Sequence, residues 1–250
     1  MKFHIKSING LAGLLLLALL PLISGCLSDD NPQDQSPDFI SDFTFLDNAG
    51  GWVQGYTDYP LDSGASLDFT FNRQQMPNDT SEYGLRISGR DNNRDLFMYM
   101  WREIGPLEAN TTYDLVITVD FIGENLETDT EQDDSPGNVV YLKAGAVNFL
   151  PSESISADDT ELGYIGIVPN FDKGNDANSG TDMLAFGTLT LPNAGQVNDP
   201  VVSVFNSVPF RITTNSQGNL YLLVGTDSQS DLHHAIIYDR IFVSYTKVTI

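Results

Sequence analysis

The sequence is poor in the residues on which many enzymes and metal sites depend. Its 250 residues include one cysteine, Cys26, and three histidines. A single cysteine excludes a disulfide within one chain. A zinc site needs three or four converging ligands, and neither an HExxH motif nor a spaced His/Cys set is present. The GxSxG motif of α/β-hydrolases is absent as well. These absences exclude several common classes of enzyme.

Basic residues are also scarce. The chain has 12 Lys and Arg against 34 Asp and Glu, a net charge of −22. Because Lys2 and Lys6 lie in the first 25 residues and every acid follows them, the remainder has a net charge of −24, ten bases against 34 acids. Nucleic acids and anionic lipid surfaces demand clustered Lys and Arg, so we expect no nucleic-acid partner. The charge is compatible with divalent cations, neutral glycans or a salty exterior.

The N-terminus has the layout of a secretory signal. Lys2 and Lys6 precede an uncharged apolar stretch, residues 11–23, and small residues lead to Cys26. The stretch is too short for a stable membrane span. A cleavage site that ends in cysteine resembles the bacterial lipobox, which implies a diacylglyceryl thioether on Cys26 and an N-linked acyl chain such as palmitate. Leu27 stands where an inner-membrane retention signal usually has Asp, so the resemblance favours the outer membrane of a Gram-negative bacterium.

Three segments are predicted along the chain: a signal peptide at 1–25, a lipidated N-terminus and disordered tether at 26–38, and a globular domain at 39–250. The tether (SDDNPQDQSPD at 28–38) is polar and acidic. The domain alternates apolar and polar residues, most clearly in 113–121 and 236–247, while 96–101 is almost wholly apolar and suits a strand buried on both faces. Because turn-rich clusters separate these runs, we predict an all-β fold, a single antiparallel β-sandwich of the jelly-roll type.

Catalytic residues are hard to find. His233 and His234 are adjacent, and neighbours on a strand point to opposite faces, so we expect surface polar residues. Residues 141–148 (YLKAGAVN) are similar to the Y-F-K-A-G-x-Y strand of alginate-lyase-like jelly rolls. That family also needs a Gln-x-His strand and a catalytic tyrosine, but Val147 holds the tyrosine position and no histidine after the signal precedes position 233. A polysaccharide lyase or hydrolase is therefore the least favoured function.

Calcium is the one cofactor that the sequence suggests. Residues 170–182 (NFDKGNDANSGTD) place side-chain oxygens at alternate positions in a glycine-containing loop. Calcium takes six to eight oxygen ligands, and such loops can wrap around it. A plain turn-rich loop explains the same pattern equally well. The candidate ligands are Asp172, Asp176, Asn178 and Asp182.

Aromatic residues indicate a possible ligand surface near the start of the domain. Flat rings exposed to solvent bind the faces of sugars, and nearby carboxylates and amides bond the hydroxyls. Trp52 could instead plug the core, as an aromatic residue often does at the start of a jelly roll. The candidate ligand-binding residues are Trp52, Tyr56, Asp58, Tyr59 and Asn92.

Five short segments of the domain stand out together. They are 51–60 (GWVQGYTDYP), 87–98 (ISGRDNNRDLFM), 136–145 (PGNVVYLKAG), 225–228 (GTDS) and 238–241 (YDRI). Together they resemble a family of bacterial lipoproteins and secreted proteins, and that resemblance implies a jelly-roll domain without any particular activity.

More loosely, the aromatic-rich start and the closing YDRIFV are similar to jelly-roll carbohydrate-binding modules, in which acidic residues near each terminus often hold a structural calcium. Asp42 and Asp239 are the matching positions.

The leading hypothesis is a non-catalytic module, anchored to the membrane by its lipid, that binds a carbohydrate or another envelope component. The alternative is a structural or protein-interaction lipoprotein of the envelope, which an exposed apolar patch or sheet edge would favour.

Overall fold

The computed structural model describes residues 36–90, 93–125, 139–156, 165–189, 201–229 and 233–249. All described residues belong to the second of the chain's two units, Ser36–Ile250. The predicted signal peptide and Cys26 lie outside the described residues. Within the described residues, no helix is long and apolar enough to cross a membrane.

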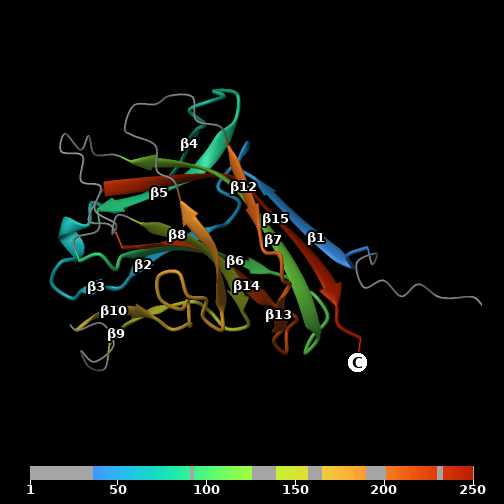
Figure 1. Ribbon diagram of the computed structural model, residues 1–250. Helices are drawn as coiled ribbons and strands as arrows, with labels where there is room; N and C mark the ends of the chain where they lie inside the picture. Colours follow the sequence, from blue (N-terminus) through green and yellow to red (C-terminus); the bar gives the residue numbers. More distant parts are fainter. Residues whose placement is uncertain are drawn as a thin grey trace, which may run out of the picture. The chain divides into compact units, whose positions relative to one another are not determined.

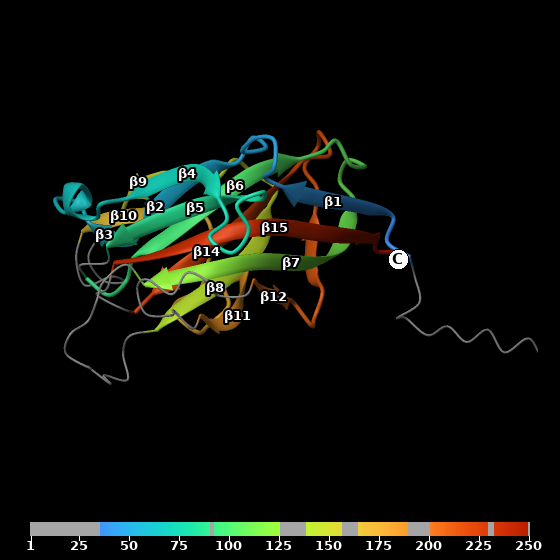
Figure 2. The ribbon, with the colours of Figure 1, turned by 90° about the horizontal axis from the view of Figure 1, so that it is seen from above.

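Two antiparallel sheets and one small sheet make up the second unit (Figures 1 and 2). The first sheet, sheet A, has the strand order β12-β7-β15-β5-β4, with β1 also paired to β15 and β13 to β7. The second, sheet B, has the order β11-β8-β14-β6-β2, and the third, sheet C, has the order β3-β10-β9. From β5 to β8 consecutive strands alternate between sheets A and B, and from β13 to β15 they do so again. The predicted all-β antiparallel sandwich is confirmed.

The strand bounds are as follows. Sheet A contains β1 (Phe39–Thr44), β4 (Thr70–Gln75), β5 (Tyr83–Arg90), β7 (Thr112–Asn125), β12 (Val202–Phe205), β13 (Phe210–Thr213) and β15 (His233–Lys247). Sheet B contains β2 (Val53–Thr57), β6 (Phe97–Ile104), β8 (Val140–Val147), β11 (Met183–Leu189) and β14 (Leu220–Ser228). Sheet C contains β3 (Tyr59–Pro60), β9 (Glu153–Ile155) and β10 (Gly166–Pro169), and one short 3-10 helix, η1, spans Gly64–Ser66.

The main core lies between sheets A and B. Strand β15 turns Ile236 and Tyr238 into this core, and after a bulge between Tyr238 and Arg240 it turns Ile241 and Val243 inward. The bulge places an extra residue opposite β7, which shifts the inward-facing positions by one. The alternation of apolar and polar residues in 236–247 predicted the strand. It did not predict this shift of the inward-facing positions, which depends on how β15 pairs with β7.

Sheet B is also covered on its outer face. The rings of Phe97 and Tyr99 stack there with centroids 5.2 Å apart, and Phe171, from the loop between β10 and β11, meets Tyr99 edge-on at 5.2 Å. Residues from Phe97 to Met100 are therefore buried on both faces, as predicted. Trp101 is only half-buried. The loop thus covers one part of the outer face.

A glycine allows this close approach. A Cβ at Gly145 of β8 would lie 2.0 Å from the Asp182 carbonyl oxygen and 2.7 Å from the Met183 Cα. Since both atoms belong to the main chain, they cannot rotate away. The absence of a side chain at Gly145 lets the end of the loop lie directly on sheet B.

Replacing Leu222 with alanine is expected to lower the free energy of unfolding by about 2–5 kcal/mol, because deletion of a buried leucine loses transfer energy and leaves a cavity. Leu222 is 1% exposed. Leu150→Ala is the matched control, since Leu150 is 58% exposed and surface changes usually stay within about 0.5 kcal/mol. Urea unfolding followed by tryptophan fluorescence measures both variants. Equal losses would contradict the position of Leu222 in the core.

Candidate functional site

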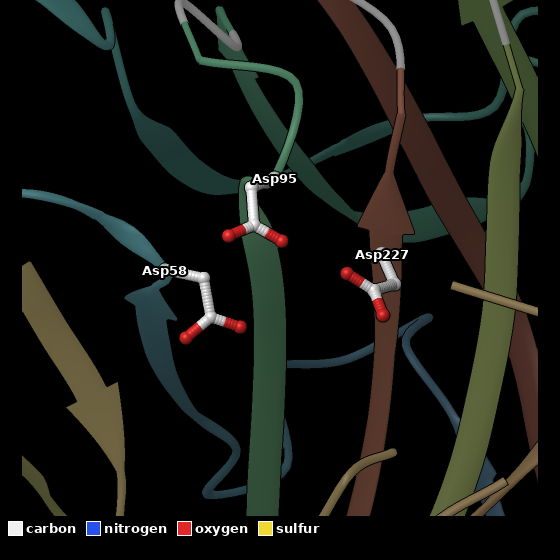
Figure 3. A group of neighbouring side chains, drawn as sticks. All are labelled: Asp58, Asp95 and Asp227. Atoms are coloured by element: carbon white, nitrogen blue, oxygen red, sulfur yellow. The ribbon is translucent and has the colours of Figure 1, made fainter. Parts of the chain in front are cut away.

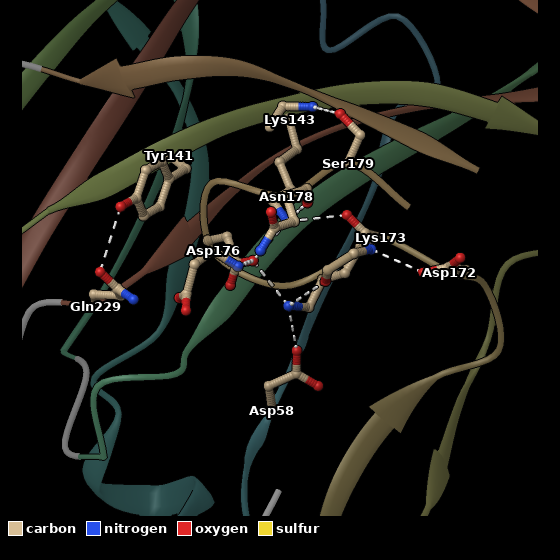
Figure 4. A network of polar contacts seen from close by, with 12 residues as sticks. Asp58, Tyr141, Lys143, Asp172, Lys173, Asp176, Asn178, Ser179 and Gln229 are labelled. Carbon is tan, nitrogen blue, oxygen red and sulfur yellow. Dashed lines mark hydrogen bonds and ion pairs between the residues drawn. The ribbon is translucent and has the colours of Figure 1, made fainter. Parts of the chain in front are cut away.

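The site is built around a lysine in the middle of an apolar strand. Lys143 of β8 is fully buried and lies opposite Gly225 on the outer face of sheet B. Its Nζ is 2.8 Å from Oδ2 of Asp227, which is also fully buried. The same ammonium donates to the main-chain carbonyls of Lys173 at 3.0 Å and Asn178 at 3.1 Å (Figure 4). Because an ammonium has three donors, each N–H of Lys143 has an acceptor.

A second lysine shares the same carboxylate oxygen. The Lys173 Nζ lies 2.9 Å from Asp227 Oδ2 and 2.9 Å from Asp58 Oδ2. Asp58 occupies the turn between β2 and β3, where its φ is +63°. Aspartate tolerates this left-handed region better than most residues. Lys143, Asp227, Lys173 and Asp58 thus form an alternating series of four buried charges, here called the ion chain.

The pKa values of the two lysines shift in opposite directions. Burial lowers the pKa of Lys143 by more than Asp227 raises it. Burial also lowers the pKa of Lys173, but the negative charges of Asp58 and Asp227 outweigh it, so that the pKa of Lys173 is raised. An ammonium held by two carboxylates stays charged more readily than one held by a single shared carboxylate.

The loop at 170–182 is folded by its own carboxylates. Asp172 accepts the N–H of Gly174 at 2.9 Å through Oδ1 and that of Thr181 at 2.8 Å through Oδ2. These two hydrogen bonds hold the pKa of Asp172 below its usual value. Asp182 Oδ2 accepts the Asp172 N–H at 2.8 Å, and the Asp176 N–H donates to Asp227 at 3.0 Å. Of the four calcium ligands predicted in this loop, Asp172 and Asp182 therefore accept hydrogen bonds through their carboxylates. The other two bond the ion chain through the main chain, Asp176 by its N–H and Asn178 by its carbonyl.

A third carboxylate comes close to the ion chain. Asp95, immediately before β6, is half-buried and has one carboxylate oxygen within 4.8 Å of an oxygen from each of Asp58 and Asp227 (Figure 3). Among the described residues, these three form the only group of three or more side chains that lie close enough to hold a metal ion together. None of the residues predicted from the sequence as calcium ligands belongs to this group.

A pocket of about 850 Å³ opens beside the ion chain. Its walls are Asp58, residues 93–95 and residues 168–176. Four carboxylates and two cations line it, which leaves an excess of two negative charges. The carboxylates are those of Asp58, Asp95, Asp172 and Asp176, and the cations are Arg94 and Lys173. Of the residues predicted to bind a ligand, Asp58 lines the pocket, and Asn92 lies outside the described residues.

The predicted aromatic platform is packed inside the protein. Trp52 is 5% exposed and Tyr59 is 8% exposed. Tyr56 is half-buried and stacks on Tyr59 at 5.3 Å and on Phe69 at 4.3 Å. Because other side chains cover these rings, Trp52 and Tyr59 do not form the exposed surface that the sequence suggested. Trp52 takes the alternative role, a plug in the core.

The two acidic residues near the termini have different neighbours. Asp42 accepts two hydrogen bonds from Arg240, at 2.7 and 2.8 Å, on the neighbouring strand. Asp239 is the extra residue of the β15 bulge, where burial and then the charges of Asp120 and Glu82 raise its pKa. Asp42 is thus paired with a guanidinium, whereas Asp239 lies among other acidic residues.

One of the two neighbouring histidines is not at the surface. His234 is fully buried at the start of β15, opposite Gly89 of β5, and His233 is half-buried. The expectation of a surface residue is therefore wrong for His234. Neither histidine lines the pocket.

The sequence did not indicate several site residues, among them Lys143, Lys173 and Asp227. Lys143 does leave one signal, because it stands inside the apolar run 139–147 (VVYLKAGAV). A charged residue in a buried strand needs a partner of opposite charge. Nothing local identifies that partner as Asp227, since the pairing of β8 with β14 creates the contact.

The described part of the chain is thus an antiparallel β-sandwich with a buried ion chain and a polar pocket at one end of sheet B. No family model matches the sequence, and no curated protein matches it. Solved structures of similar architecture include several carbohydrate-binding modules.

Three of these structures illustrate the likeness. The CBM22-1 and GH10 modules of endo-1,4-β-D-xylanase 10B from Clostridium thermocellum, complexed with xylohexaose, match at 12% identity and a TM-score of 0.40, over 84% of this chain and 28% of that one. The mannan-recognising module TmCBM27 matches at 12% identity and 0.36, over 86% and 98%. The family 11 module of the Clostridium thermocellum cellulase Lic26A-Cel5E matches at 7% identity and 0.37, over 85% and 97%. At these TM-scores the likeness carries no argument about function.

Lys143→Met is expected to lower the free energy of unfolding by about 3–5 kcal/mol, because removal of one partner leaves a buried charge and buried carbonyls unsatisfied. Lys247→Met is the matched control. Lys247 pairs with Glu108 at the surface, where both side chains are exposed, so its loss should hardly change the stability. Urea unfolding of both variants measures the difference. A loss from Lys143→Met no greater than that of the control would contradict the ion chain.

The stabilising effect of Asp172 is expected to depend on pH. A carboxyl whose pKa is lowered in the folded state stabilises the protein above its unfolded pKa, and the effect is lost as the pH falls through the folded pKa. The pKa of Asp172 lies below its model-compound value of 3.8. The difference in unfolding free energy between the wild type and Asp172→Asn should therefore be largest near about pH 7 and shrink toward about pH 3. A difference that stays constant would contradict this role.

Proposed function

We propose that this protein is an envelope-anchored, non-catalytic module that binds a neutral glycan in the pocket beside the ion chain. The observation that carries the proposal is the lining of this pocket, which combines carboxylates, amides and a guanidinium with the apolar residues Val168, Pro169 and Phe171. Binding sites of this kind use a few placed polar groups to orient a ligand and apolar atoms to bury its surface.

The pocket has groups that can bond sugar hydroxyls. Arg94 and Asn175 are exposed, and Asp176 is half-buried. Guanidinium groups donate hydrogen bonds, carboxylates accept them, and amides do both. A sugar hydroxyl in the pocket can therefore act as a donor or as an acceptor. The carboxylate of Asp58 is engaged in the ion chain and that of Asp172 in the loop, which keeps the walls in place.

Charge narrows the class of glycan. The lining has an excess of two negative charges, and like charges repel strongly at short range where water is partly excluded. A polyuronate such as alginate is therefore disfavoured, and a neutral glycan is favoured. The same repulsion disfavours the anionic substrate of a lyase, and neither His233 nor His234 lines the pocket. Both observations support binding rather than lyase activity.

Anchoring is the second part of the proposal. The first strand begins at Phe39, so the lipid predicted on Cys26 would be joined to the sandwich by a short polar segment. Two or three acyl chains anchor a protein durably, whereas one chain does so only marginally. The module would then present its pocket at the outer membrane of a Gram-negative cell.

A second candidate function rests on sheet C. Leu61, Ile155 and Ile165 are 50%, 58% and 54% exposed. They lie on neighbouring segments, since the Leu61 N–H donates to the Ile165 carbonyl and Ile155 pairs with Ile167. Clustered exposed apolar residues favour contact with another protein, which supports an interaction lipoprotein of the envelope.

A glycan-array screen of residues 27–250, which keep every described strand, tests the first proposal. We expect saturable binding to a neutral glycan, and Arg94→Ala should weaken it at least about tenfold, which corresponds to about 1.4 kcal/mol. Arg211→Ala is the matched control, because Arg211 pairs with Asp114 on sheet A and does not line the pocket.

Two outcomes would count against the pocket as a glycan site. An absence of saturable binding to every glycan would favour the interaction lipoprotein, and cross-linking in intact envelopes would then identify the partner. Equal weakening by Arg94→Ala and Arg211→Ala would place the glycan elsewhere on the domain.

A further inference from the structure

Three carboxylates converge at one end of sheet B because of the register of three neighbouring strands. Asp58 follows β2, Asp95 precedes β6 and Asp227 belongs to β14. Thr57 pairs with Phe97, and Phe97 pairs with Asp227, so these strand positions are level with one another. Figure 3 shows the three carboxylates turned toward one another, and one oxygen of each lies within 4.8 Å of the others.

Three oxygens within 4.8 Å of one another are close enough to bind one calcium ion together. Calcium–oxygen distances are about 2.3–2.6 Å, so two oxygens on opposite sides of the ion are about 4.6–5.2 Å apart. Magnesium binds at about 2.0–2.1 Å and demands a stricter octahedral geometry. We propose that Asp58, Asp95 and Asp227 together bind one calcium ion at the inner wall of the pocket. These residues differ from every calcium ligand that the sequence suggested.

A buried oxygen supports the proposal independently of the acidic cluster. Asp227 is fully buried, and its Oδ2 accepts from Lys143, Lys173 and the Asp176 N–H. Its Oδ1 is buried and, within the described part of the chain, has no hydrogen-bond partner. An anionic oxygen withdrawn from water without a partner is strongly unfavourable. A metal ion on Oδ1 would remove that penalty.

The ion does not have to displace a lysine. Lys173 contacts Oδ2 of Asp227, not Oδ1. The pocket lining has an excess of two negative charges, and beneath it Lys143 and Asp227 balance each other. One divalent cation therefore neutralises the summed charge of the pocket lining and this buried pair.

Two of the three carboxylates line the pocket. Asp58 and Asp95 belong to the lining, and Asp227 lies behind them with its side chain buried, so an ion that enters from the pocket meets Asp58 and Asp95 first. Calcium takes six to eight ligands, and three carboxylates supply only part of them. The remaining positions face the pocket, where water or the hydroxyl groups of a ligand can occupy them.

Calorimetric titration of the full chain in detergent with calcium chloride, in the absence of any glycan, tests the site. We expect one ion per chain with a dissociation constant of about 10⁻⁴–10⁻³ M, the range of extracellular calcium modules. Saturating calcium should also raise the melting temperature, because a ligand that binds only the folded state stabilises it. Asp95→Asn is the main variant, since Asp95 is half-buried and outside the ion chain, and it should weaken calcium binding at least about tenfold.

Asp42→Asn is the control, because Asp42 pairs with Arg240 on sheet A. It should leave both the stoichiometry and the calcium-induced rise in melting temperature unchanged. No binding by the wild-type protein, or undiminished binding by Asp95→Asn, would overturn the proposal. Since no glycan is present in the titration, either result leaves the proposed glycan binding to be judged separately.

Discussion

Two ammonium groups share one carboxylate oxygen in the interior of this domain. Through Asp227, the ion chain connects β8 and β14 of sheet B with the β2–β3 turn and with the loop between β10 and β11. Withdrawing each charge from water costs several kcal/mol, so such a chain persists only where partners of opposite charge and further hydrogen bonds surround it. Lys143 meets this condition with the carbonyls of Lys173 and Asn178, besides its contact with Asp227.

The contribution of the ion chain is positional rather than energetic. A buried ion pair can often be replaced by packed apolar side chains without loss of stability. Apolar side chains, however, could not bind the carbonyls of residues 173 and 178, and these contacts fix the main chain of the loop on sheet B. Asp172 acts in the same way on the N–H groups of Gly174 and Thr181. The pocket wall is therefore held in place by contacts within the domain, which would reduce the ordering that the proposed binding requires.

The strands were predictable from the sequence, and most of the site was not. Alternation over 113–121 and 236–247 follows from strands with one face on a core, and the structure has β7 and β15 there. The site depends on pairing between strands that are far apart in the chain, which periodicity does not encode. Even so, four of the five segments that carry the family resemblance each contribute one charged residue to this end of sheet B. These residues are Asp58, Asp95, Lys143 and Asp227.

Asp58 and Lys173 belong both to the ion chain and to the pocket lining. A charged ligand in the pocket therefore acts on the ion chain as well. An anion would compete with Asp58 for Lys173, and a cation placed on the same oxygens would compete with Lys173 for Asp58. By linkage, a ligand that weakens the ion chain binds less tightly by the same free energy. The two proposed ligands, a neutral glycan and a metal ion held on Oδ1 of Asp227, would both leave this pair intact.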